Sequence, residues 1–151
     1  MRCPGNRGKT ILTPEETNAV VLWIIASYGI NAFHIFPRLS LISPEMRCGK
    51  STTMSIIAAM CRDGLQVSNI SPAIIFRLAS EYDVTLLIDE ADTFVKNGDP
   101  ALIGLINSGH CKSTATTLRC DGDGHTPKTF RTWFPMALAS IGDLPRTIMD
   151  R

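Results

Sequence analysis

Residues 84–88 constrain the fold more than any other segment, because Val-Thr-Leu-Leu-Ile is a continuous apolar run of β-favouring residues. A strand covered on one face alternates apolar and polar residues, whereas a parallel strand covered on both faces does not. A second short apolar run, Met-Ala-Leu-Ala, occupies 136–139, and strand-like segments precede it at 38–43 and 66–68. The pattern predicts an α/β fold with a largely parallel sheet between two helical layers.

Helix-start signals alternate with these strands. Thr13, Pro14 and Glu16 form an N-cap, a first-position proline and a capping-box acid, which predict a helix to about residue 28. Proline also follows a capping residue at 71–72 and 99–100, which predicts two more helices. The segment from Lys50 to about Arg62 carries an apolar stripe at helical spacing, and we expect Gly64 to close it; the stripe is Met54, Ile57, Ala58 and Cys61.

Composition indicates one globular domain, since the 151 residues are 44% hydrophobic and 19% charged. We expect residues 1–12 to be a flexible basic segment, 13–151 to be the domain, and the domain to continue past Arg151. The net charge of +1 gives no indication about nucleic acid. Five cysteines without framework spacing favour a reducing, cytoplasmic location. The apolar stretch from Ala19 to Phe36 is interrupted by polar residues, so we expect no membrane association.

A candidate phosphate loop links the strand-like segment 38–43 to the helix that begins at Lys50. Backbone N–H groups and the positive end of the helix dipole can surround phosphates there, and Lys50 adds a mobile positive charge. Pro44 stands where such loops usually begin with glycine, so we expect the loop entry to differ from the common form. The expected nucleotide-binding residues are Met46, Arg47, Cys48, Gly49, Lys50, Ser51 and Thr52.

The strand at 84–88 ends in an acidic pair. We expect Ser51 and Asp89 to bind Mg²⁺, which prefers few protein oxygens and keeps several waters, and Glu90 to orient the attacking water. In a structural interpretation, Lys50 is a solvated lysine at a helix start and the acidic pair is a helix N-cap. Asp92 is expected to be an ordinary surface residue.

Residues 112–133 are rich in threonine, with Asp-Gly-Asp-Gly at their centre, and predict an inserted β-hairpin. Its basic residues either contact DNA phosphates or form a solvated face; they are Lys112, Arg119, Lys128 and Arg131. A zinc site is disfavoured because the spacing of its candidate ligands matches no paired pattern; these are His110, Cys111, Cys120 and His125. Cys48 lacks an evident partner base for nucleophilic catalysis.

Several motifs together resemble one family: 44–52, Asn-Ile-Ser-Pro at 69–72, Phe-Arg at 76–77, 86–94, 105–110 and 141–145. The chain resembles the P-loop ATPase domain attached to Toprim or primase modules in bacterial, phage and plasmid proteins, a relative of replicative helicases. The resemblance covers roughly residues 13–151 and implies a three-layer P-loop NTPase sandwich. Proline at position 44 is common in that family.

The resemblance also implies roles that the residues alone do not. Ser140 resembles a sensor of the γ-phosphate or attacking water, although a strand-end hydroxyl is the structural alternative. Arg151 resembles an arginine finger acting in trans, which implies a homo-oligomer. The implied function is an ATP-binding, Mg²⁺-dependent ATPase, a helicase-like motor or accessory in mobile-element DNA replication, with single-stranded DNA and a primase or Toprim protein as partners. Alternatives are a nucleotide-binding regulatory or inactive fragment without turnover, and a small-molecule phosphotransferase.

Overall fold

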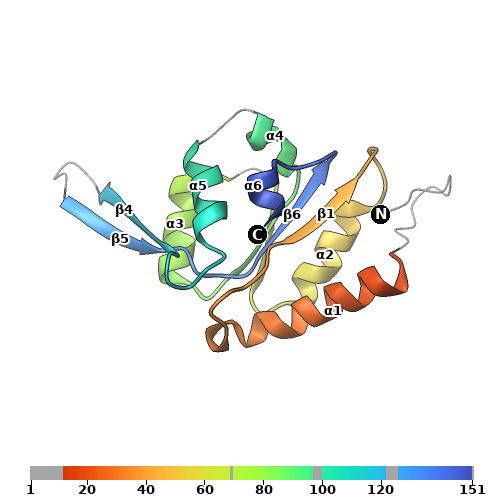
Figure 1. Ribbon diagram of the computed structural model, residues 1–151, viewed down its shortest axis with the longest axis horizontal. Helices are drawn as coiled ribbons and strands as arrows, with labels where there is room; N and C mark the ends of the chain where they lie inside the picture. The colour runs from red at the N-terminus through yellow and green to blue at the C-terminus, as the bar shows by residue number, and fades with distance from the viewer. Residues whose placement is uncertain (1–11, 69, 97–99, 122–125, 151) are drawn as a thin grey trace.

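The computed structural model of the chain describes residues 12–68, 70–96, 100–121 and 126–150. Four strands form a main sheet and two form a separate hairpin (Figure 1), so the predicted α/β class is confirmed. In chain order, the elements are α1 (Pro14–Tyr28), the 3-10 helix η1 (Ile30–Ala32), β1 (Leu39–Ser43), α2 (Lys50–Met60), β2 (Gly64–Val67), α3 (Pro72–Glu81), β3 (Thr85–Ile88), α4 (Ala91–Lys96), α5 (Pro100–Ser108), β4 (Thr116–Asp121), β5 (Thr126–Arg131), β6 (Met136–Ile141) and α6 (Arg146–Met149).

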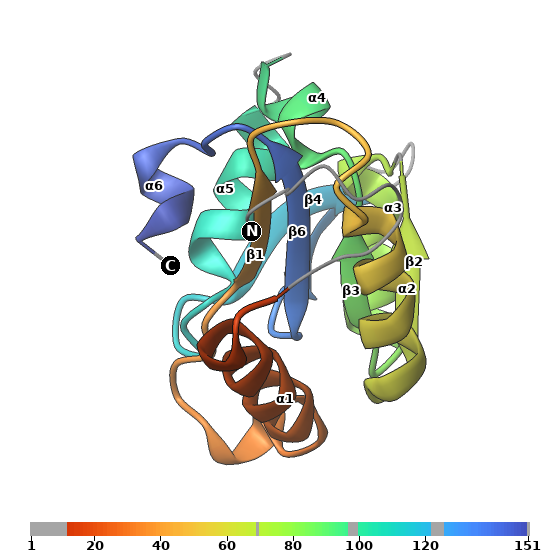
Figure 2. The same cartoon turned by 90° about the vertical axis from the view of Figure 1, so that its right-hand side faces the viewer.

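The main sheet has the strand order β1-β6-β3-β2, and every neighbouring pair is parallel (Figure 2). β6 therefore lies between β1 and β3, where Leu41 pairs with Ala139 and Leu87 pairs with Ala137. Because parallel strands all run in one direction, the carboxyl ends of β1, β6 and β3 meet at the same edge of the sheet. Residues that follow these three strands are brought together despite their separation in sequence.

Helices cover both faces of this sheet (Figure 1), which makes three layers. Every residue of β3 is buried, yet successive side chains join different cores: Leu86 and Ile88 pack with α3 and α5, whereas Leu87 packs with α1 and α2. β6 divides its residues in the same way. Burial on both faces explains why these strands read as apolar runs without alternation.

The first helix confirms its sequence prediction. The Thr13 backbone N–H donates to Glu16 Oε2 at 2.8 Å, and the Glu16 N–H donates to Thr13 Oγ1 at 3.2 Å, which completes the capping box. On the buried side of α1, Trp23 Nε1 donates to the Pro37 carbonyl at 2.9 Å. This bond fixes α1 against the segment that leads into β1.

The helix boundaries around α2 differ from the expectation. α2 ends at Met60, and Gly64 begins β2 instead of closing the helix. A Cβ atom on Gly64 would lie 2.1 Å from the Ala58 carbonyl oxygen, so β2 passes too close to α2 for any larger residue. α4 follows the acidic pair directly and was not predicted, because Ala91–Lys96 has no apolar stripe long enough to mark a helix.

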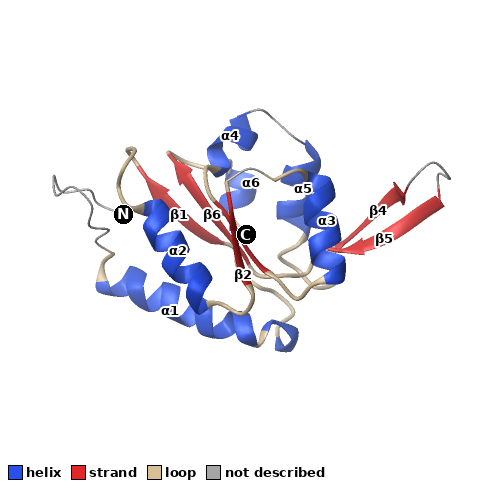
Figure 3. Ribbon diagram, turned by 180° about the vertical axis from the view of Figure 1, so that it is seen from behind, coloured by secondary structure: helices blue, strands red, loops and turns tan. Residues whose placement is uncertain are grey.

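The inserted hairpin is confirmed as the antiparallel pair β4 and β5, which face each other from Thr116↔Arg131 to Asp121↔Thr126. It projects from the body at the end away from the loop between β1 and α2 (Figures 1 and 3). Phe130 anchors it to α3 through Phe76, with ring centroids 6.0 Å apart.

Three of the four hairpin-region cations lie against groups of the protein itself. The Arg119 guanidinium lies 4.7 Å from the centroid of the Phe76 ring, and Lys128 Nζ lies 5.5 Å from a ring centroid on β5. Lys112 Nζ donates to a backbone carbonyl of η1 at 2.9 Å. Arg131 is exposed. Arg119 and Lys128 are nevertheless exposed, as Arg131 is, so both DNA contact and a solvated face remain predictions for these residues.

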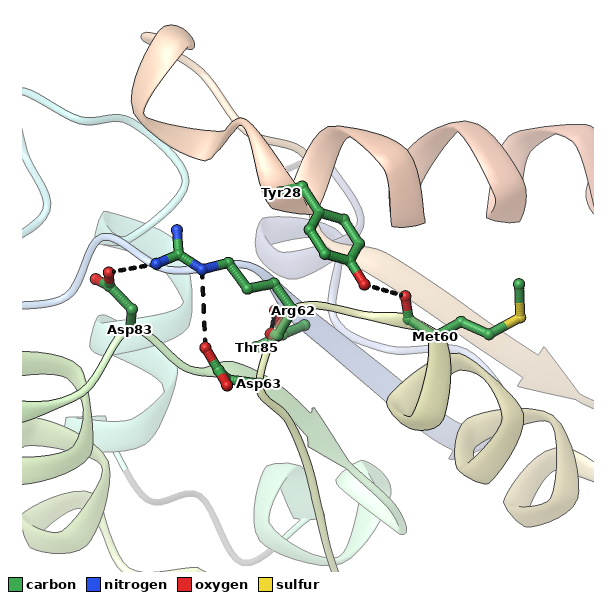
Figure 4. Close-up of polar contacts among 6 residues, drawn as sticks. All are labelled: Tyr28, Met60, Arg62, Asp63, Asp83 and Thr85. Carbon is green, nitrogen blue, oxygen red and sulfur yellow. Dashed lines mark hydrogen bonds and ion pairs between the residues drawn. The ribbon is translucent and has the colours of Figure 1, made fainter.

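Polar contacts tie the elements together at the edge formed by the amino ends of the strands (Figure 4). The Tyr28 hydroxyl donates to the Met60 carbonyl at 2.9 Å, which joins the ends of α1 and α2. Arg62 Nη2 lies 2.9 Å from Asp83 Oδ2, and Thr85 Oγ1 donates to the Arg62 carbonyl at 2.7 Å. These contacts hold the turn before β2 against the start of β3.

Arg38 is buried at the same edge, just before β1. Its Nη1 donates to the Phe134 carbonyl at 2.7 Å, and within the described residues its Nε and Nη2 have no hydrogen-bond partner. Desolvation lowers the pKa of the guanidinium to about 9, so the group still carries its charge at neutral pH. Gly109 lies against it, because a Cβ there would come within 2.2 Å of Arg38 Nη2.

Among the described residues, no helix is both long enough and apolar enough to cross a bilayer. Cys61, Cys111 and Cys120 are free thiols, and burial raises the pKa of the Cys61 thiol. Cys48 is disulfide-bonded. This bond differs from the fully reduced chain that a reducing cytoplasm implies, so the location remains a prediction.

Candidate functional site

A cleft of about 430 Å³ lies at the carboxyl ends of β1, β6 and β3. It is lined by the candidate phosphate loop and the start of α2, by the residues after β3, and by the end of β6; these are Met46, Arg47, Cys48, Gly49, Lys50, Ser51, Thr52, Asp89, Glu90, Asp92, Ala139, Ser140 and Ile141. Every predicted site residue that the structure describes lines this one cleft. Arg151 lies outside the described residues.

The order of the strands explains why a cleft forms there. α2 carries the chain from β1 to the far edge of the sheet over one face, whereas α3 and α5 return it over the other face. The neighbouring strands β1 and β6 also diverge, because β6 leads to α6, whose Ile148 packs in the core with α3 and α5. Connections that leave neighbouring strands toward opposite faces open a crevice at the carboxyl edge. The Gly142 backbone N–H donates to the Ser43 carbonyl at 3.0 Å, which ties the end of β6 to the end of β1 beside that crevice.

Lys50 is buried at the start of α2, which disfavours the interpretation as a solvated helix-start lysine. Its Nζ donates to Ser43 Oγ and lies 3.4 Å from the Glu45 carbonyl oxygen. Ser43 Oγ in turn donates to Glu45 at 2.7 Å. The ammonium group therefore lies inside the loop, held by neutral oxygens and by no carboxylate among the described residues.

The backbone hand alternates along the candidate phosphate loop. Arg47 has φ 62° and Gly49 has φ 78°, while the residues beside them have negative φ. Alternation of this kind forms the concave backbone nests that bind anions. Gly49 is also the N-cap of α2, and among the described residues no side chain of the N-cap bonds the first-turn N–H groups. Neither left-handed position is Pro44, which makes its fixed φ compatible with this loop.

The acidic residues after β3 differ in environment. Asp89 is buried, and its Oδ1 accepts the Glu90 backbone N–H at 3.0 Å, which leaves Oδ2 without a protein donor in the described part of the chain. Glu90 is exposed and has a left-handed backbone, φ 55°. The pair could therefore offer the cleft one fixed carboxylate and one mobile carboxylate.

Asp92 is not the surface residue that we expected. It is half-buried, it lines the cleft, and its Oδ1 accepts the Ile141 backbone N–H at 3.4 Å. The sequence gives little indication that Asp92 faces the cleft, because its orientation depends on α4 beginning at Ala91. The contact links the start of α4 to the end of β6.

Ser140 ends the buried part of β6, and 1% of its surface is exposed. Its Oγ donates to the Gly142 carbonyl at 3.0 Å, so its lone pairs remain available as an acceptor. The residue lies between the candidate phosphate loop and the acidic pair because β6 lies between β1 and β3. Its location fits both a sensor role and a strand-end hydroxyl.

The hollow at the other edge of the sheet and the candidate zinc ligands have weaker support as functional sites. A hollow of about 490 Å³ lies at the amino ends of β3 and β6, but its Arg62 and Asp83 bind each other. For zinc, no three His, Cys, Asp or Glu side chains of the described residues gather into a ligand cluster, and His125 lies outside those residues. Cys48 Sγ lies 3.8 Å from the Met46 carbonyl oxygen, and a disulfide on it adds bulk to the loop.

Comparison of the chain with protein-family models and with curated proteins gave no match. The proposals for this cleft therefore rest on its geometry and on the motif resemblance.

Proposed function

We propose that the protein is a Mg²⁺-dependent ATPase that binds the nucleotide's phosphates in the cleft at the carboxyl ends of β1, β6 and β3. The observation that carries the proposal is the convergence of Lys50, Asp89, Glu90 and Ser140 on that cleft from three separate strand ends. A buried cation, an anion-binding backbone and two carboxylates are the groups that phosphoryl transfer to water requires.

Binding would exchange contacts that the loop already makes. Lys50 now bonds Ser43 and the Glu45 carbonyl, both neutral acceptors. Phosphate oxygens are charged acceptors and form stronger hydrogen bonds with an ammonium group, so Lys50 can leave the loop oxygens for the β- and γ-phosphates. The first turn of α2, which its N-cap Gly49 does not cap with a side chain, supplies further N–H donors.

The oxygen donors in the cleft fit a magnesium ion. Ser51 supplies a hydroxyl at the start of α2, and Asp89 supplies the carboxylate oxygen without a protein donor in the described part of the chain. Magnesium accepts one or two carboxylates and completes its shell with water and substrate phosphates. When bound, the ion neutralises charge that develops on the phosphates.

Hydrolysis would use the exposed acid. Glu90 orients a water molecule and accepts its proton as the water oxygen bonds to the γ-phosphorus, while the bond to the bridging oxygen breaks and ADP leaves. Ser140 can accept a hydrogen bond from that water, since its own proton is donated to Gly142. A trans arginine finger, for which Arg151 is the candidate, contributes about 10³–10⁵ in rate, so an isolated subunit would turn over slowly.

The wider role is a helicase-like motor or accessory in mobile-element DNA replication, and its support is the motif resemblance. A DNA-dependent ATPase should be accelerated by single-stranded DNA. A phosphotransferase would instead consume ATP only with a small acceptor, and a regulatory fragment would bind ATP without turnover at any protein concentration.

The first test is a titration of Mg-ATP into the wild-type chain and Lys50→Ala, monitored with a fluorescent nucleotide in a reducing buffer that opens the Cys48 disulfide. Wild type should bind, and Lys50→Ala should lose at least about tenfold in affinity, because a charged hydrogen bond to phosphate is lost. Lys128→Ala, on the hairpin, is the matched control and should bind as wild type does. Equal binding by Lys50→Ala would contradict the assignment of the loop.

A further inference from the structure

Arg47 has a backbone conformation that its side chain does not favour. It lies three residues before Lys50 in the candidate phosphate loop, and its φ is 62°. A left-handed backbone costs free energy for any residue with a Cβ atom, whereas glycine adopts it freely. Gly49, two residues later, meets the same requirement with glycine. Glycine at position 47 would therefore lower the conformational free energy of the loop.

The other left-handed residues of the described chain indicate where such strain occurs. Only Arg47, Asp63 and Glu90 combine a side chain with positive φ in that part of the chain. Asp63 has a short polar side chain, which tolerates this conformation in tight turns. Arg47 and Glu90 have long charged side chains, and both line the cleft. Strained backbone persists where the surrounding structure holds it, commonly at ligand sites.

No described residue of the protein holds the Arg47 side chain in place. It is exposed, and within the described residues no hydrogen bond or ion pair joins its guanidinium to another group. Arg38, in contrast, donates to Phe134, and Arg62 binds Asp83. Packing and local pairing therefore do not explain an arginine in this strained position, whereas an anionic ligand in the cleft does.

We propose that Arg47 is a second cationic ligand of the nucleotide, which binds the terminal phosphate from the same loop as Lys50. This inference rests on the proposed function. A planar guanidinium binds two phosphate oxygens at once, while an ammonium group acts as a point charge, so the two side chains supply different contacts. The subunit that binds the nucleotide would then supply part of the positive charge at the terminal phosphate itself, in addition to any arginine finger from a neighbouring subunit.

The inference predicts selectivity between nucleotides. ADP lacks the terminal phosphate, so removal of the guanidinium weakens ATP binding more than ADP binding. A charged hydrogen bond of this kind corresponds to about a 10- to 100-fold change in affinity. A purely structural role for Arg47 would change both affinities together.

The test compares wild type, Arg47→Gly, Arg47→Asn and Lys50→Ala by titration with Mg-ATP and Mg-ADP, each preceded by a thermal melt in reducing buffer. Arg47→Gly should melt at or above the wild-type temperature, because strain is removed, and its ATP affinity should fall about 10- to 100-fold with a much smaller loss for ADP. Arg47→Asn tolerates positive φ without added chain flexibility and should behave in the same way.

Equal losses for ATP and ADP, or wild-type affinity for both, would overturn the assignment of Arg47. If Lys50→Ala loses ATP binding while Arg47→Gly keeps it, only the role of Arg47 is wrong. If Lys50→Ala also binds ATP as wild type does, the proposed function itself is wrong.

Discussion

Charged side chains have different partners at the two ends of the parallel sheet. At the amino end, Arg62 binds Asp83, and Thr85 donates to the Arg62 carbonyl (Figure 4). At the carboxyl end, Lys50 is held by neutral oxygens, and Arg47 forms no ion pair with the described residues. The comparison supports the proposal that the charged side chains at the carboxyl end bind a ligand, whereas those at the amino end stabilise the fold.

Positive φ at long charged side chains follows the same division, since Asp63, the described non-glycine residue with positive φ at the amino end, has a short side chain. Both long charged residues with positive φ, Arg47 and Glu90, lie at the carboxyl end. At the amino end, the close approaches are met by glycine, as at Gly109 beside Arg38. Changes at the carboxyl end should therefore affect ligand chemistry with little loss of stability, and changes at the amino end should do the reverse.

The largest effect is expected for Glu90→Gln at the carboxyl end. Loss of the carboxylate removes the group that orients water and accepts its proton, so turnover should fall by about 10²–10⁴ while Mg-ATP affinity stays near the wild-type value. Single-turnover hydrolysis at high protein concentration measures the rate, and the fluorescence titration measures binding.

Glu81→Gln, at the amino end, is the matched control and should keep the wild-type rate. If Glu90→Gln hydrolyses ATP as fast as wild type, the proposed catalytic role of the carboxyl end is wrong.

Gly109→Ala should have the next largest effect, and it acts on stability. The added methyl group would lie 2.2 Å from Arg38 Nη2 and 2.7 Å from the Thr132 carbonyl oxygen, and a backbone atom cannot easily move. Overpacking of this kind costs about 1–3 kcal/mol in the free energy of unfolding, measured by urea denaturation.

Gly104→Ala provides the opposite control on α5, where an added Cβ meets nothing within 4 Å. It should stabilise the protein by about 0.5–1 kcal/mol, because alanine favours a helix interior. Similar free energies of unfolding for the two variants would show that the Arg38 environment tolerates an extra atom.

The smallest effect is expected for Tyr28→Phe. The substitution removes the hydroxyl that donates to the Met60 carbonyl, but the side chain is 57% exposed and water can replace the bond. The free energy of unfolding should fall by about 0.5 kcal/mol, with unchanged Mg-ATP affinity. A loss of nucleotide affinity in this variant would mean that the two ends of the sheet are coupled.

Local patterns predicted most of the elements. The capping box at Thr13 and Glu16 placed the start of α1, and the apolar run at 84–88 marked the central strand, since both signals depend on neighbours in sequence. α4 escaped prediction because six residues carry little periodicity. Asp92 was misjudged for the same reason, since its place in the cleft depends on that helix and on the Ile141 N–H.

By itself, the sequence determined the loop before Lys50, the acidic pair after a buried strand and the alternation of strands and helices, because each is a local arrangement of residue types. Only the tertiary structure decided that β6 lies between β1 and β3, that Arg38 is buried, and that Arg47 has positive φ. These features depend on pairings between segments distant in sequence, and no local pattern specifies them.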